Sequence, residues 1–587
     1  MRKDDMNQRV LLAVLISFVF IIVYSLIFQD PQKQKTSNAS NPATPNPALA
    51  TTDSTTPNAQ NLAQNPQSPQ PNLAPATPTA QSTAPATKRN IISTITSNGV
   101  EVQIDDLGRI AQVYLKDKKF TAPKQEGIFT HLGRLFGLAS TPNAPLEKLP
   151  LLSPNAVFPL EMRFEDAALN IEATQTPYTA SLKSISLDST QNQTLTLTQK
   201  LSTLTITKTI EFIYDEDGLK YKLHIALSTP KVYFLSSGSR PIADDDGYAF
   251  HGVVLKQGGI NGVIEKIEDK DAKIEGQNFS QVPFVSASDR YFTTLLFSRE
   301  DSGLAVQVLG TSDTKNPIPY IILASDTALE GYVGPKDYRD LAKIYPVLTD
   351  VVEYGLITFF AKPVFLLLDW LYVLLGNWGW AIIGVTLVVR IILFPLSYKG
   401  IMSMQRLKDL TPKMKEIQEQ YKGDPQKMQA QLMQLYKKHG ANPLGGCLPI
   451  ILQIPVFFAI YRVLYNAVEL KNSEWIFWIH DLSVMDPYFI LPILMGVSMY
   501  IQQILTPNTL DPMQARIFKL LPVIFTIFLI TFPAGLVLYW TVNNIFAILM
   551  QIAINKIIDK QKAQAILEHK EHKSTKSTPK STQGEKK

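Results

Sequence analysis

The chain has 587 residues, of which 45% are hydrophobic and 18% are charged. This length exceeds one ordinary domain, and a formal net charge of +5 is too small to indicate a nucleic-acid-binding protein. Cys447 is the only cysteine, which excludes an internal disulfide and a cysteine metal cluster.

The N-terminal segment, residues 1–30, contains an apolar stretch at Val10–Phe28 that follows Arg2, Lys3 and Arg9. The stretch is about long enough to cross a ~30 Å hydrocarbon core. Because no A-x-A cleavage pattern follows it, we interpret it as an uncleaved membrane anchor (TM1) with its N-terminus in the cytoplasm. A cleaved signal peptide is the alternative.

Residues 31–89 consist largely of Pro, Ala, Thr, Asn and Gln, with almost no large apolar side chain. Such a segment buries too little surface to offset the entropy cost of ordering it. We therefore predict a disordered linker between the anchor and the next domain.

Residues 90–344 show the alternation of half-buried β-strands, for example where Ile206 and Ile210 alternate with Thr and Lys. Turn signals such as Asp217-Gly218 separate the apolar runs. The pattern predicts a periplasmic all-β sandwich of two antiparallel sheets. No HExxH, GxSxG, P-loop or glycine-rich dinucleotide motif occurs in it. Strands are expected at Val100–Ile104, Leu219–Leu227, Tyr291–Phe297 and Leu304–Leu309.

Residues 345–376 mix apolar side chains with Glu353, Lys362 and Asp369. A membrane span rarely carries so many charges, whereas a helix in the plane of the interface does. We expect an amphipathic helix along the periplasmic surface of the membrane.

The C-terminal part of the chain contains the remaining apolar segments. We predict TM2 at 377–397, TM3 at 444–466, TM4 at 487–506 and a TM5–TM6 hairpin at 518–555, whose two spans meet at Phe532-Pro533-Ala534-Gly535. With the anchor, these segments give a membrane α-helical bundle of six transmembrane helices. The connections are a cytoplasmic helical hairpin at 398–443, a periplasmic loop at 467–486, a cytoplasmic loop at 507–517 and a basic cytoplasmic tail at 556–587.

The charges of these connections predict the orientation. Lysine and arginine are concentrated in 398–443 and 556–587, whereas Lys471 is the only one in the acidic loop 467–486. Because cytoplasmic loops favour Lys and Arg, we place both termini in the cytoplasm and the β domain outside.

Arg390 lies deep in the predicted TM2, roughly 12 Å from its cytoplasmic edge if Tyr398 marks that edge. A charge at mid-bilayer costs from about 3 to above 10 kcal/mol. The side chain either snorkels back to the headgroups or faces a water-filled cavity between the spans.

Polar side chains on other spans favour the cavity. Thr386 lies one helical turn from Arg390, on the same face. The other polar side chains are Ser, Thr, Asn and Gln residues, and each alone would be explained by a hydrogen bond between helices. Because the spans also contain Arg390, we expect some of these side chains to line a common cavity with it. The spans contain no acidic partner, so such a cavity suits a transient acidic guest. These residues are Gln453, Ser498, Gln502, Gln503, Thr541, Asn543 and Asn544.

Two cytoplasmic segments are candidate docking sites. In 398–443, Leu407, Leu410 and Met414 follow helical spacing, and Gly423-Asp424-Pro425 ends one helix and begins a second. The tail at 556–587 is lysine-rich and expected to be disordered, so it is suited to ribosomal RNA or anionic lipid. The alternative for both segments is that their charges only set the topology.

A series of short motifs runs from Gly331 to about Ile554. They include Asn377-Trp378-Gly379, Val389-Arg390, Asn442-Pro443-Leu444-Gly445-Gly446-Cys447, Gln453-Ile454-Pro455, Trp478-Ile479-His480-Asp481-Leu482, Asp486-Pro487-Tyr488, Asp511-Pro512-Met513 and Pro533-Ala534-Gly535-Leu536. Together, these motifs resemble those of the YidC-type membrane protein insertases of the bacterial inner membrane, in the form with a large periplasmic domain.

The resemblance implies a hydrophilic groove that opens to the cytoplasm and to lipid but is closed outside. Its arginine corresponds to Arg390 and its threonine to Thr386. It also implies a hydrophobic slide for the substrate on TM3 and TM5, at Ile454, Phe457, Pro522, Phe525 and Phe528. A tyrosine pair of the family corresponds to Tyr539-Trp540, where the tryptophan departs from the pattern.

The predicted function is that of an insertase and chaperone for nascent inner-membrane proteins, acting alone or with the Sec translocon. The expected partners are nascent membrane proteins, the ribosome, the Sec translocon with its accessory subunits, and anionic lipids. We expect no catalytic residue, metal or cofactor. An ion or solute channel or transporter is the alternative, although the inverted repeats and paired broken helices typical of transporters are not found. An enzyme would need a clustered acid–base pair or nucleophile.

Overall fold

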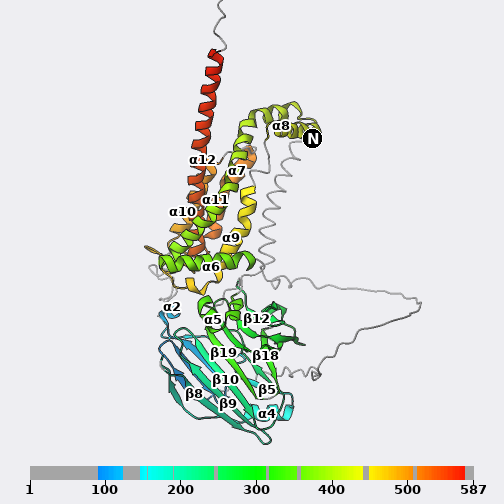
Figure 1. The fold of residues 1–587 in the computed structure, drawn as a ribbon, viewed down its shortest axis with the longest axis vertical. Helices are drawn as coiled ribbons and strands as arrows, with labels where there is room; N and C mark the ends of the chain where they lie inside the picture. The colour runs from blue at the N-terminus through cyan, green and yellow to red at the C-terminus, as the bar shows by residue number, and fades with distance from the viewer. Residues whose placement is uncertain are drawn as a thin grey trace, which may run out of the picture. The chain divides into compact units, whose positions relative to one another are not determined.

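The structure is a computed structural model that describes residues 90–122, 146–154, 156–189, 191–243, 249–311, 316–324, 326–352, 358–440, 448–506 and 512–575. The predicted anchor at 10–28 and linker at 31–89 lie outside these residues. Within the described part, a region of β-strands is followed along the chain by a group of apolar helices (Figure 1).

The β domain contains nineteen described strands. These are β1 (Ile91–Thr96), β2 (Val100–Asp105), β3 (Ile110–Leu115), β4 (Leu149–Pro150), β5 (Met162–Phe164), β6 (Thr179–Ala180), β7 (Ser184–Ser186), β8 (Gln193–Lys200), β9 (Thr205–Ile213), β10 (Leu219–Leu227), β11 (Tyr233–Ser236), β12 (Gly252–Gln257), β13 (Val263–Glu268), β14 (Gln277–Val282), β15 (Phe284–Ser288), β16 (Phe292–Phe297), β17 (Leu304–Gly310), β18 (Pro317–Leu323) and β19 (Thr327–Pro335). Short helices accompany them: α2 (Lys118–Thr121), α4 (Ala167–Gln175), α5 (Tyr338–Ile344), η2 (Asp269–Asp271) and η3 (Pro346–Val351).

The described strands form three sheets, not the two that the sequence predicted. A nine-stranded sheet has the order β13-β12-β15-β16-β19-β10-β9-β8-β6, and two five-stranded sheets have the orders β4-β3-β2-β1-β7 and β14-β17-β18-β11-β5. Apolar side chains of all three sheets share one core, for example Ile104, Ile210 and Val306. The alternation of a single strand shows which face is buried but not which strands pair, so the division into sheets was not visible in the sequence.

Alternation along the strands accounts for this core. In β9, every second side chain is buried, and Ile210 pairs with Leu223 of β10 across the sheet. Lys208 shares the inward face with Ile206 and Ile210 and is fully buried. The sheet therefore encloses a cation that needs polar partners.

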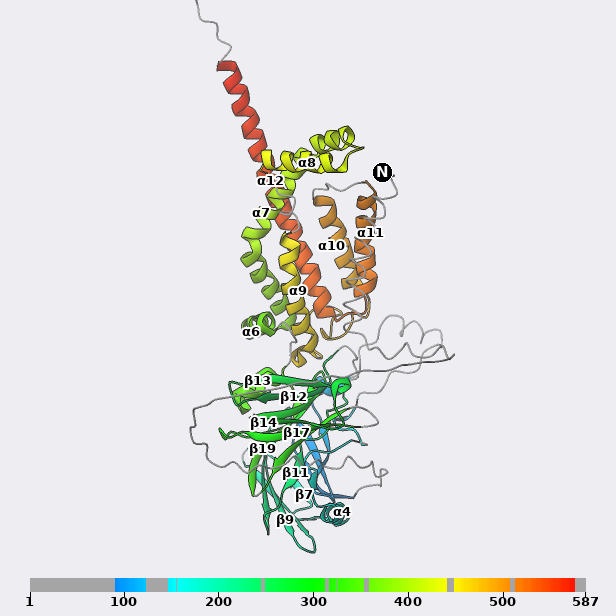
Figure 2. The same ribbon diagram turned by 90° about the vertical axis from the view of Figure 1, so that its right-hand side faces the viewer.

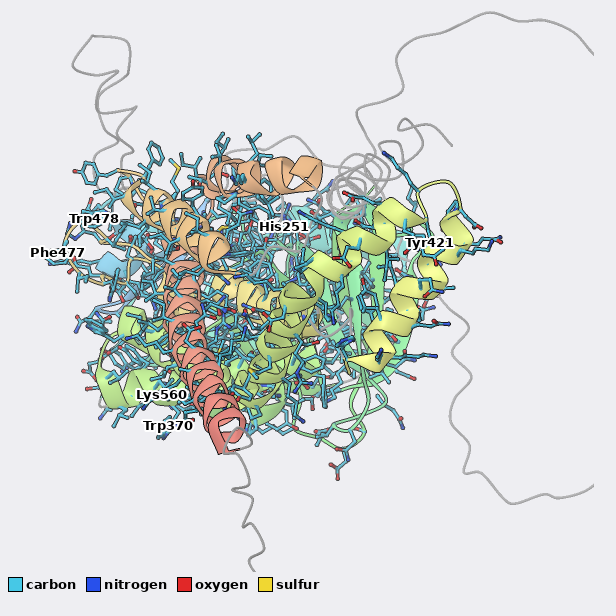
Figure 3. All side chains as sticks on the ribbon, turned by 90° about the horizontal axis from the view of Figure 1, so that it is seen from above. His251, Trp370, Tyr421, Phe477, Trp478 and Lys560 are labelled. Atoms are coloured by element: carbon cyan, nitrogen blue, oxygen red, sulfur yellow. The ribbon has the colours of Figure 1, made fainter. Side chains whose placement is uncertain are left out.

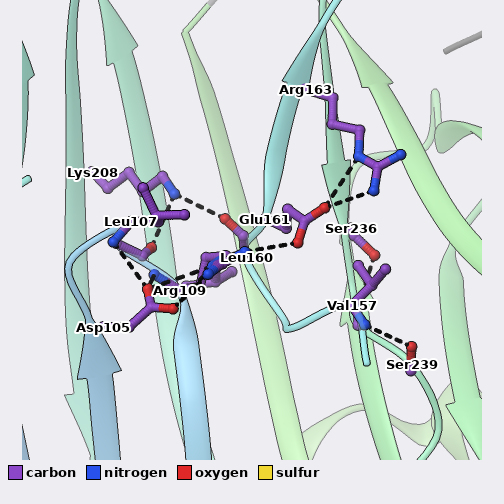
Figure 4. A network of polar contacts seen from close by, with 12 residues as sticks. Asp105, Leu107, Arg109, Val157, Leu160, Glu161, Arg163, Lys208, Ser236 and Ser239 are labelled. Atoms are coloured by element: carbon purple, nitrogen blue, oxygen red, sulfur yellow. Dashed lines mark hydrogen bonds and ion pairs between the residues drawn. The ribbon is translucent and has the colours of Figure 1, made fainter. Parts of the chain in front are cut away.

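A network of charged side chains surrounds Lys208 (Figure 4). Its Nζ donates to the carbonyls of Gly108 and Leu160 at 2.9 and 2.8 Å. Arg109 forms ion pairs with Asp105 at 2.7 Å and with Glu161 at 3.0 Å. Burial lowers the pKa of Lys208 to about 7, although Asp105 favours its charged form. The network joins β2, β9 and the segment before β5 inside the domain.

The C-terminal part of the described chain forms long helices. These are α6 (Thr358–Leu375), α7 (Trp378–Gln420), α8 (Pro425–Lys438), α9 (Leu448–Asn466), α10 (Ile490–Leu505), α11 (Pro512–Leu529) and α12 (Ala534–Thr575), with a short 3-10 turn η6 (Val468–Leu470) after α9. Helix α12 packs against both α7 and α10, and α11 packs on α10. Figure 2 shows α9, α10, α11 and α12 running in a common direction, and Figure 1 shows α6 running across these helices.

Two helices continue beyond the bounds that the sequence predicted. α7 does not end at 397 but runs on to Gln420, through Pro395 and Pro412. α12 runs to Thr575, so the tail is helical and not disordered over 556–575. In both cases a span continues directly into an amphipathic or charged helix, and Gly400 lies inside α7 without ending it. Helix α8 begins at Pro425, with Asp424 as its N-cap, as expected.

By length and composition, three described helices are able to cross a membrane: α6, α7 and the segment 534–564 of α12. The helices α10 and Lys519–Leu529 of α11 are apolar but shorter. α6 passes this criterion although the sequence predicted an interfacial helix. Its charged residues bind the end of the β domain, because Asp369 pairs with Arg339 at 2.6 Å and Lys362 with Asp350 at 3.7 Å.

Candidate functional site

Arg390 on α7 is bound by a single residue of α12. Its Nε donates to Oδ1 of Asn543 at 2.8 Å, and its Nη2 donates to the main-chain carbonyl of Asn543 at 3.0 Å. Asn543 is buried and Arg390 is half-buried. Among the described residues, the cation is thus held in place by neutral oxygen atoms and not by a carboxylate.

Tyr539 and Gln453 extend this polar centre toward α9. Tyr539, one helical turn before Asn543, is buried and interacts electrostatically with Arg390. Its hydroxyl is hydrogen-bonded to the side chain of Gln453. Helices α7 and α12 therefore meet at Arg390, and Gln453 of α9 joins the same polar centre through Tyr539.

Thr386 is buried one turn from Arg390, but its hydroxyl donates to the carbonyl of Ile382 in its own helix at 2.6 Å. Thr541 makes the same kind of bond, to Val537 at 2.8 Å. The hydroxyl donors of both residues are thus satisfied locally, which leaves only their oxygen lone pairs for a guest.

Helix α10 contributes a second polar contact with α12. Asn544 donates to Oγ of Ser498 at 3.1 Å, and Ser498 in turn donates to the carbonyl of Met495 at 2.6 Å. Both side chains are buried. Gln502, one turn further along α10, is half-buried. Ser498 therefore forms a hydrogen bond between α10 and α12. The structure does not bring Ser498 or Gln502 into contact with Arg390.

An aromatic cluster lies beside the polar centre. Trp540 is half-buried and contacts Phe457 of α9 edge-on, with ring centroids 4.6 Å apart, and Phe525 of α11 at 5.7 Å. Because adjacent residues of a helix point about 100° apart, Tyr539 faces the polar centre and Trp540 faces the aromatic side chains of α9 and α11. Trp540 joins the two helices on which the slide was predicted, a role that its position next to Tyr539 did not reveal.

The other residues of the predicted slide differ in exposure. Ile454 and Phe528 are 46% and 56% exposed, whereas Pro522 is buried. Phe528 contacts Phe532 at 5.1 Å between ring centroids. Ile524 and Ile527 of α11 are exposed as well, so α11 presents several apolar side chains outward besides Phe528.

The loop between α9 and α10 covers one end of these helices. Its main chain accepts hydrogen bonds from the first residues of α12: Ala534 donates to Val484 at 2.6 Å and Gly535 to Leu482 at 2.9 Å. Asp486 is fully buried and accepts from Trp478 Nε1 at 3.0 Å and from the amide of Leu491 at 2.7 Å. These bonds satisfy N–H groups at the starts of α10 and α12, so the loop is fixed over this end.

Aromatic and apolar side chains are exposed around the same end. Phe477 is 80% exposed and stacks on Trp478, and Trp370 of α6 is also exposed (Figure 3). Burial raises the pKa of Asp481 in this loop, where the carboxylate accepts from Ser483 at 2.7 Å. An aromatic rim of this kind is typical of a membrane interface.

These features define a class: an integral membrane protein with a large β domain and apolar helices that hold a cation among amide and phenol groups. Two family models match the chain, "60Kd inner membrane protein" over residues 370–562 and "YidC periplasmic domain" over residues 141–367. The protein named membrane protein insertase YidC of Helicobacter pylori is 55% identical over 577 residues, which cover 97% of this chain and 100% of the relative. The chain belongs to the YidC family of membrane protein insertases.

Relatives with the same name in other organisms are similarly close. The protein of Wolinella succinogenes is 50% identical, with 96% of this chain and 97% of the relative covered, and that of Campylobacter jejuni is 46% identical, with 94% and 97% covered. A solved YidC insertase structure has a TM-score of 0.34 at 18% identity, covering 79% of this chain and 95% of that one, a likeness too small to carry an argument. The resemblance found in the sequence is confirmed, and with it the expectation of an insertase instead of an enzyme.

Proposed function

We propose that this insertase receives the short polar N-terminus of a nascent membrane protein in a hydrophilic groove around Arg390. The groove opens to the cytoplasm and to lipid. The main support is the pair of bonds from Arg390 to Asn543, which fix the guanidinium without neutralising it. Because the predicted spans 377–397, 444–466, 487–506 and 518–555 contain no Asp or Glu, an acidic guest meets an uncompensated cation.

The apolar part of the substrate leaves along the slide. Phe457, Phe525 and Trp540 form its base, and the exposed Ile454 and Phe528 continue it. Each central Leu or Ile of the substrate contributes about −0.5 kcal/mol on the insertion scale, so ~20 of them approach −10 kcal/mol. This offsets one or two charges at about 3 kcal/mol each, so insertion needs no nucleotide.

The outer end of the groove is closed by the loop between α9 and α10. Its hydrogen bonds to Ala534 and Gly535 and the buried Asp486 support this part of the proposal. With the basic cytoplasmic segments, they also support an inner-membrane protein of six spans with both termini in the cytoplasm. In this arrangement α6 lies in the outer interface, tied to the β domain through Asp369 and Lys362.

The cytoplasmic segments are proposed to receive the ribosome, the Sec translocon with its accessory subunits, and anionic lipids. The α7–α8 hairpin is closed by a small apolar seam of Leu407, Leu410, Met414 and Tyr436. It is joined to α12 through Lys562 and Asp409, which are 2.8 Å apart. The basic surfaces of these helices are then available to phosphate groups.

The test compares two substrates that differ only in their N-terminal tail, one acidic and one with Asn and Gln in place of the acids. Arg390→Ala is expected to slow insertion of the acidic substrate at least ~10-fold more than that of the neutral one. Arg406→Ala is the matched control, because Arg406 is exposed on the same helix, α7. Equal insertion of both substrates by Arg390→Ala overturns the proposal, and ion or solute flux through liposomes carrying the wild-type protein would point to a channel.

A further inference from the structure

The end of α9 is capped by a residue of the β domain. Nε of Arg290 donates to the main-chain carbonyl of Tyr465 at 2.8 Å. Tyr465 is the next-to-last residue of α9, where carbonyl groups have no partner within the helix. A cation at this end also interacts favourably with the helix dipole. Arg290 thus provides a hydrogen-bond donor and a positive charge at the C-terminal end of α9.

Two aromatic rings enclose the same guanidinium. The Cζ atom of Arg290 lies 4.0 Å from the ring centroid of Tyr465 and 4.5 Å from that of Tyr291. Arg290 is 7% exposed. Cation–π contacts are strongest when water is excluded, so burial strengthens this clamp.

The turn that carries Arg290 is held rigidly. It connects β15 and β16, and the fully buried Asp289 accepts from the amides of Tyr291 and Phe292 at 2.8 and 2.6 Å. Lys336, after β19, donates its amide to the carbonyl of Tyr291 at 2.7 Å. A pre-formed turn presents the arginine with little loss of entropy on contact.

From Tyr465 a column of rings leads along α9 to the slide. Tyr465 stacks on Tyr461 with centroids 5.4 Å apart, and Tyr461 stacks on Phe457 at 6.3 Å. Phe457 contacts Trp540 at 4.6 Å. The spacing of four residues places the three rings on one face of the helix. Arg290 therefore lies at one end of a continuous stack and the slide at the other.

Pro455 divides α9 just before this column. A proline inside a helix removes one main-chain hydrogen bond, so the two sides of Pro455 are less tightly coupled than in an unbroken helix. The part from Val456 to Asn466 carries the stack. The capped end thus fixes the segment that includes Phe457.

We propose that Arg290 is a positioning residue for insertion: the β domain holds the slide helix through the Arg290–Tyr465 cap and so sets the place of Phe457 against Trp540. The inference deepens the proposed function and depends on its slide. Arg290 itself does not touch the substrate.

The experiment uses the full-length protein in liposomes and two readouts. Hydrogen–deuterium exchange over 459–472 reports the cap, and photo-crosslinking from position 457 to an inserting substrate reports the slide. Arg290→Ala is expected to raise exchange roughly tenfold and to reduce the crosslink several-fold. Arg290→Lys, which keeps the charge, is expected to restore more of both than Arg290→Gln.

Arg299→Ala is the matched control, because Arg299 also lies in the β domain but binds Glu330 and the carbonyl of Ile344. It is expected to change neither readout. If Arg290→Ala does not accumulate, the proposal is tested by comparing Arg290→Lys with Arg290→Gln, and the lysine variant is expected to show less exchange and more crosslinking. Unchanged exchange in Arg290→Ala, or equal values for Lys and Gln, overturns the cap. Raised exchange with an unchanged crosslink overturns its role in positioning. Absence of the crosslink in the wild type, with raised exchange in Arg290→Ala, means instead that the proposed slide is wrong.

Discussion

Arg390 and Asn543 are joined by two hydrogen bonds, one to the side-chain oxygen and one to the main-chain carbonyl of the same asparagine. The carbonyl belongs to α12 in any sequence, but the side-chain oxygen requires Asn or Asp at this position. Asn positions the guanidinium and leaves its charge available, whereas Asp would supply a permanent counterion. This choice makes the charge at Arg390 open to an incoming carboxylate.

Asn543→Asp is therefore expected to slow insertion of an acidic-tail substrate, because the new carboxylate competes with the guest for Arg390. A neutral-tail substrate should be much less affected. Insertion rates of the two substrates into proteoliposomes provide the measurement. Asn555→Asp, about three turns along the same helix, is the control and should leave the ratio of the two rates unchanged. Faster insertion of the acidic substrate by Asn543→Asp would contradict this reasoning.

Trp540→Ala is expected to loosen the contact between α9 and α11, because Trp540 packs on both Phe457 and Phe525. Each ring pair contributes about 0.5–1.5 kcal/mol beyond burial, so the midpoint of thermal unfolding in detergent should fall. Trp540→Tyr keeps an aromatic ring, so its unfolding midpoint should fall less than that of Trp540→Ala. A midpoint for the alanine variant equal to that of the wild type would show that the cluster does not hold these helices.

Lys208 predicts a pH dependence of the stability of the β domain. Burial lowers its pKa from 10.5 to about 7, so between these values the unfolded chain binds a proton that the folded chain has lost. Stability from this residue consequently rises with pH across that window, by at most about 1.4 kcal/mol per pH unit, and is lowest below pH 7.

Lys208→Met removes the pH-dependent contribution of Lys208 to the stability of the β domain. The difference in unfolding free energy between wild type and variant is expected to shift in favour of the wild type as the pH is raised from 7 to 10. Denaturant unfolding of the full-length protein, followed through a probe in the β domain, measures it. Lys222→Met is the control, because Lys222 is largely exposed on the neighbouring strand. A difference that does not vary with pH would mean that Lys208 is not buried as described.

Local patterns of the sequence predicted the elements that depend on local physics. Alternation predicted Leu219–Leu227 as β10, and Arg390 inside an apolar run predicted polar side chains between helices. The inward position of Lys208 was also contained in the period of two that buries Ile206 and Ile210. The division of the β domain into three sheets depends on pairing between distant strands and left no local signal.

Contacts between distant segments could likewise not be predicted from the sequence. Arg290 and Tyr465 are 175 residues apart, and nothing in the turn Asp289-Arg290-Tyr291 indicates a helix end as its partner. Trp540 looked like a departure from a tyrosine pair, whereas its contacts with Phe457 and Phe525 show a packing role. The spacing of Phe457, Tyr461 and Tyr465 was the one local sign of the aromatic column.

The most direct measurement of the central claim is the accessibility of position 390 from the cytoplasm. Arg390→Cys is placed in a Cys447→Ser background, and inverted membrane vesicles are treated with a membrane-impermeant thiol reagent, with Arg406→Cys as the exposed reference. Position 390 is expected to be modified from the cytoplasmic side, as position 406 is. No modification at 390, with full modification at 406, would show that the arginine does not face water and would contradict the proposed groove.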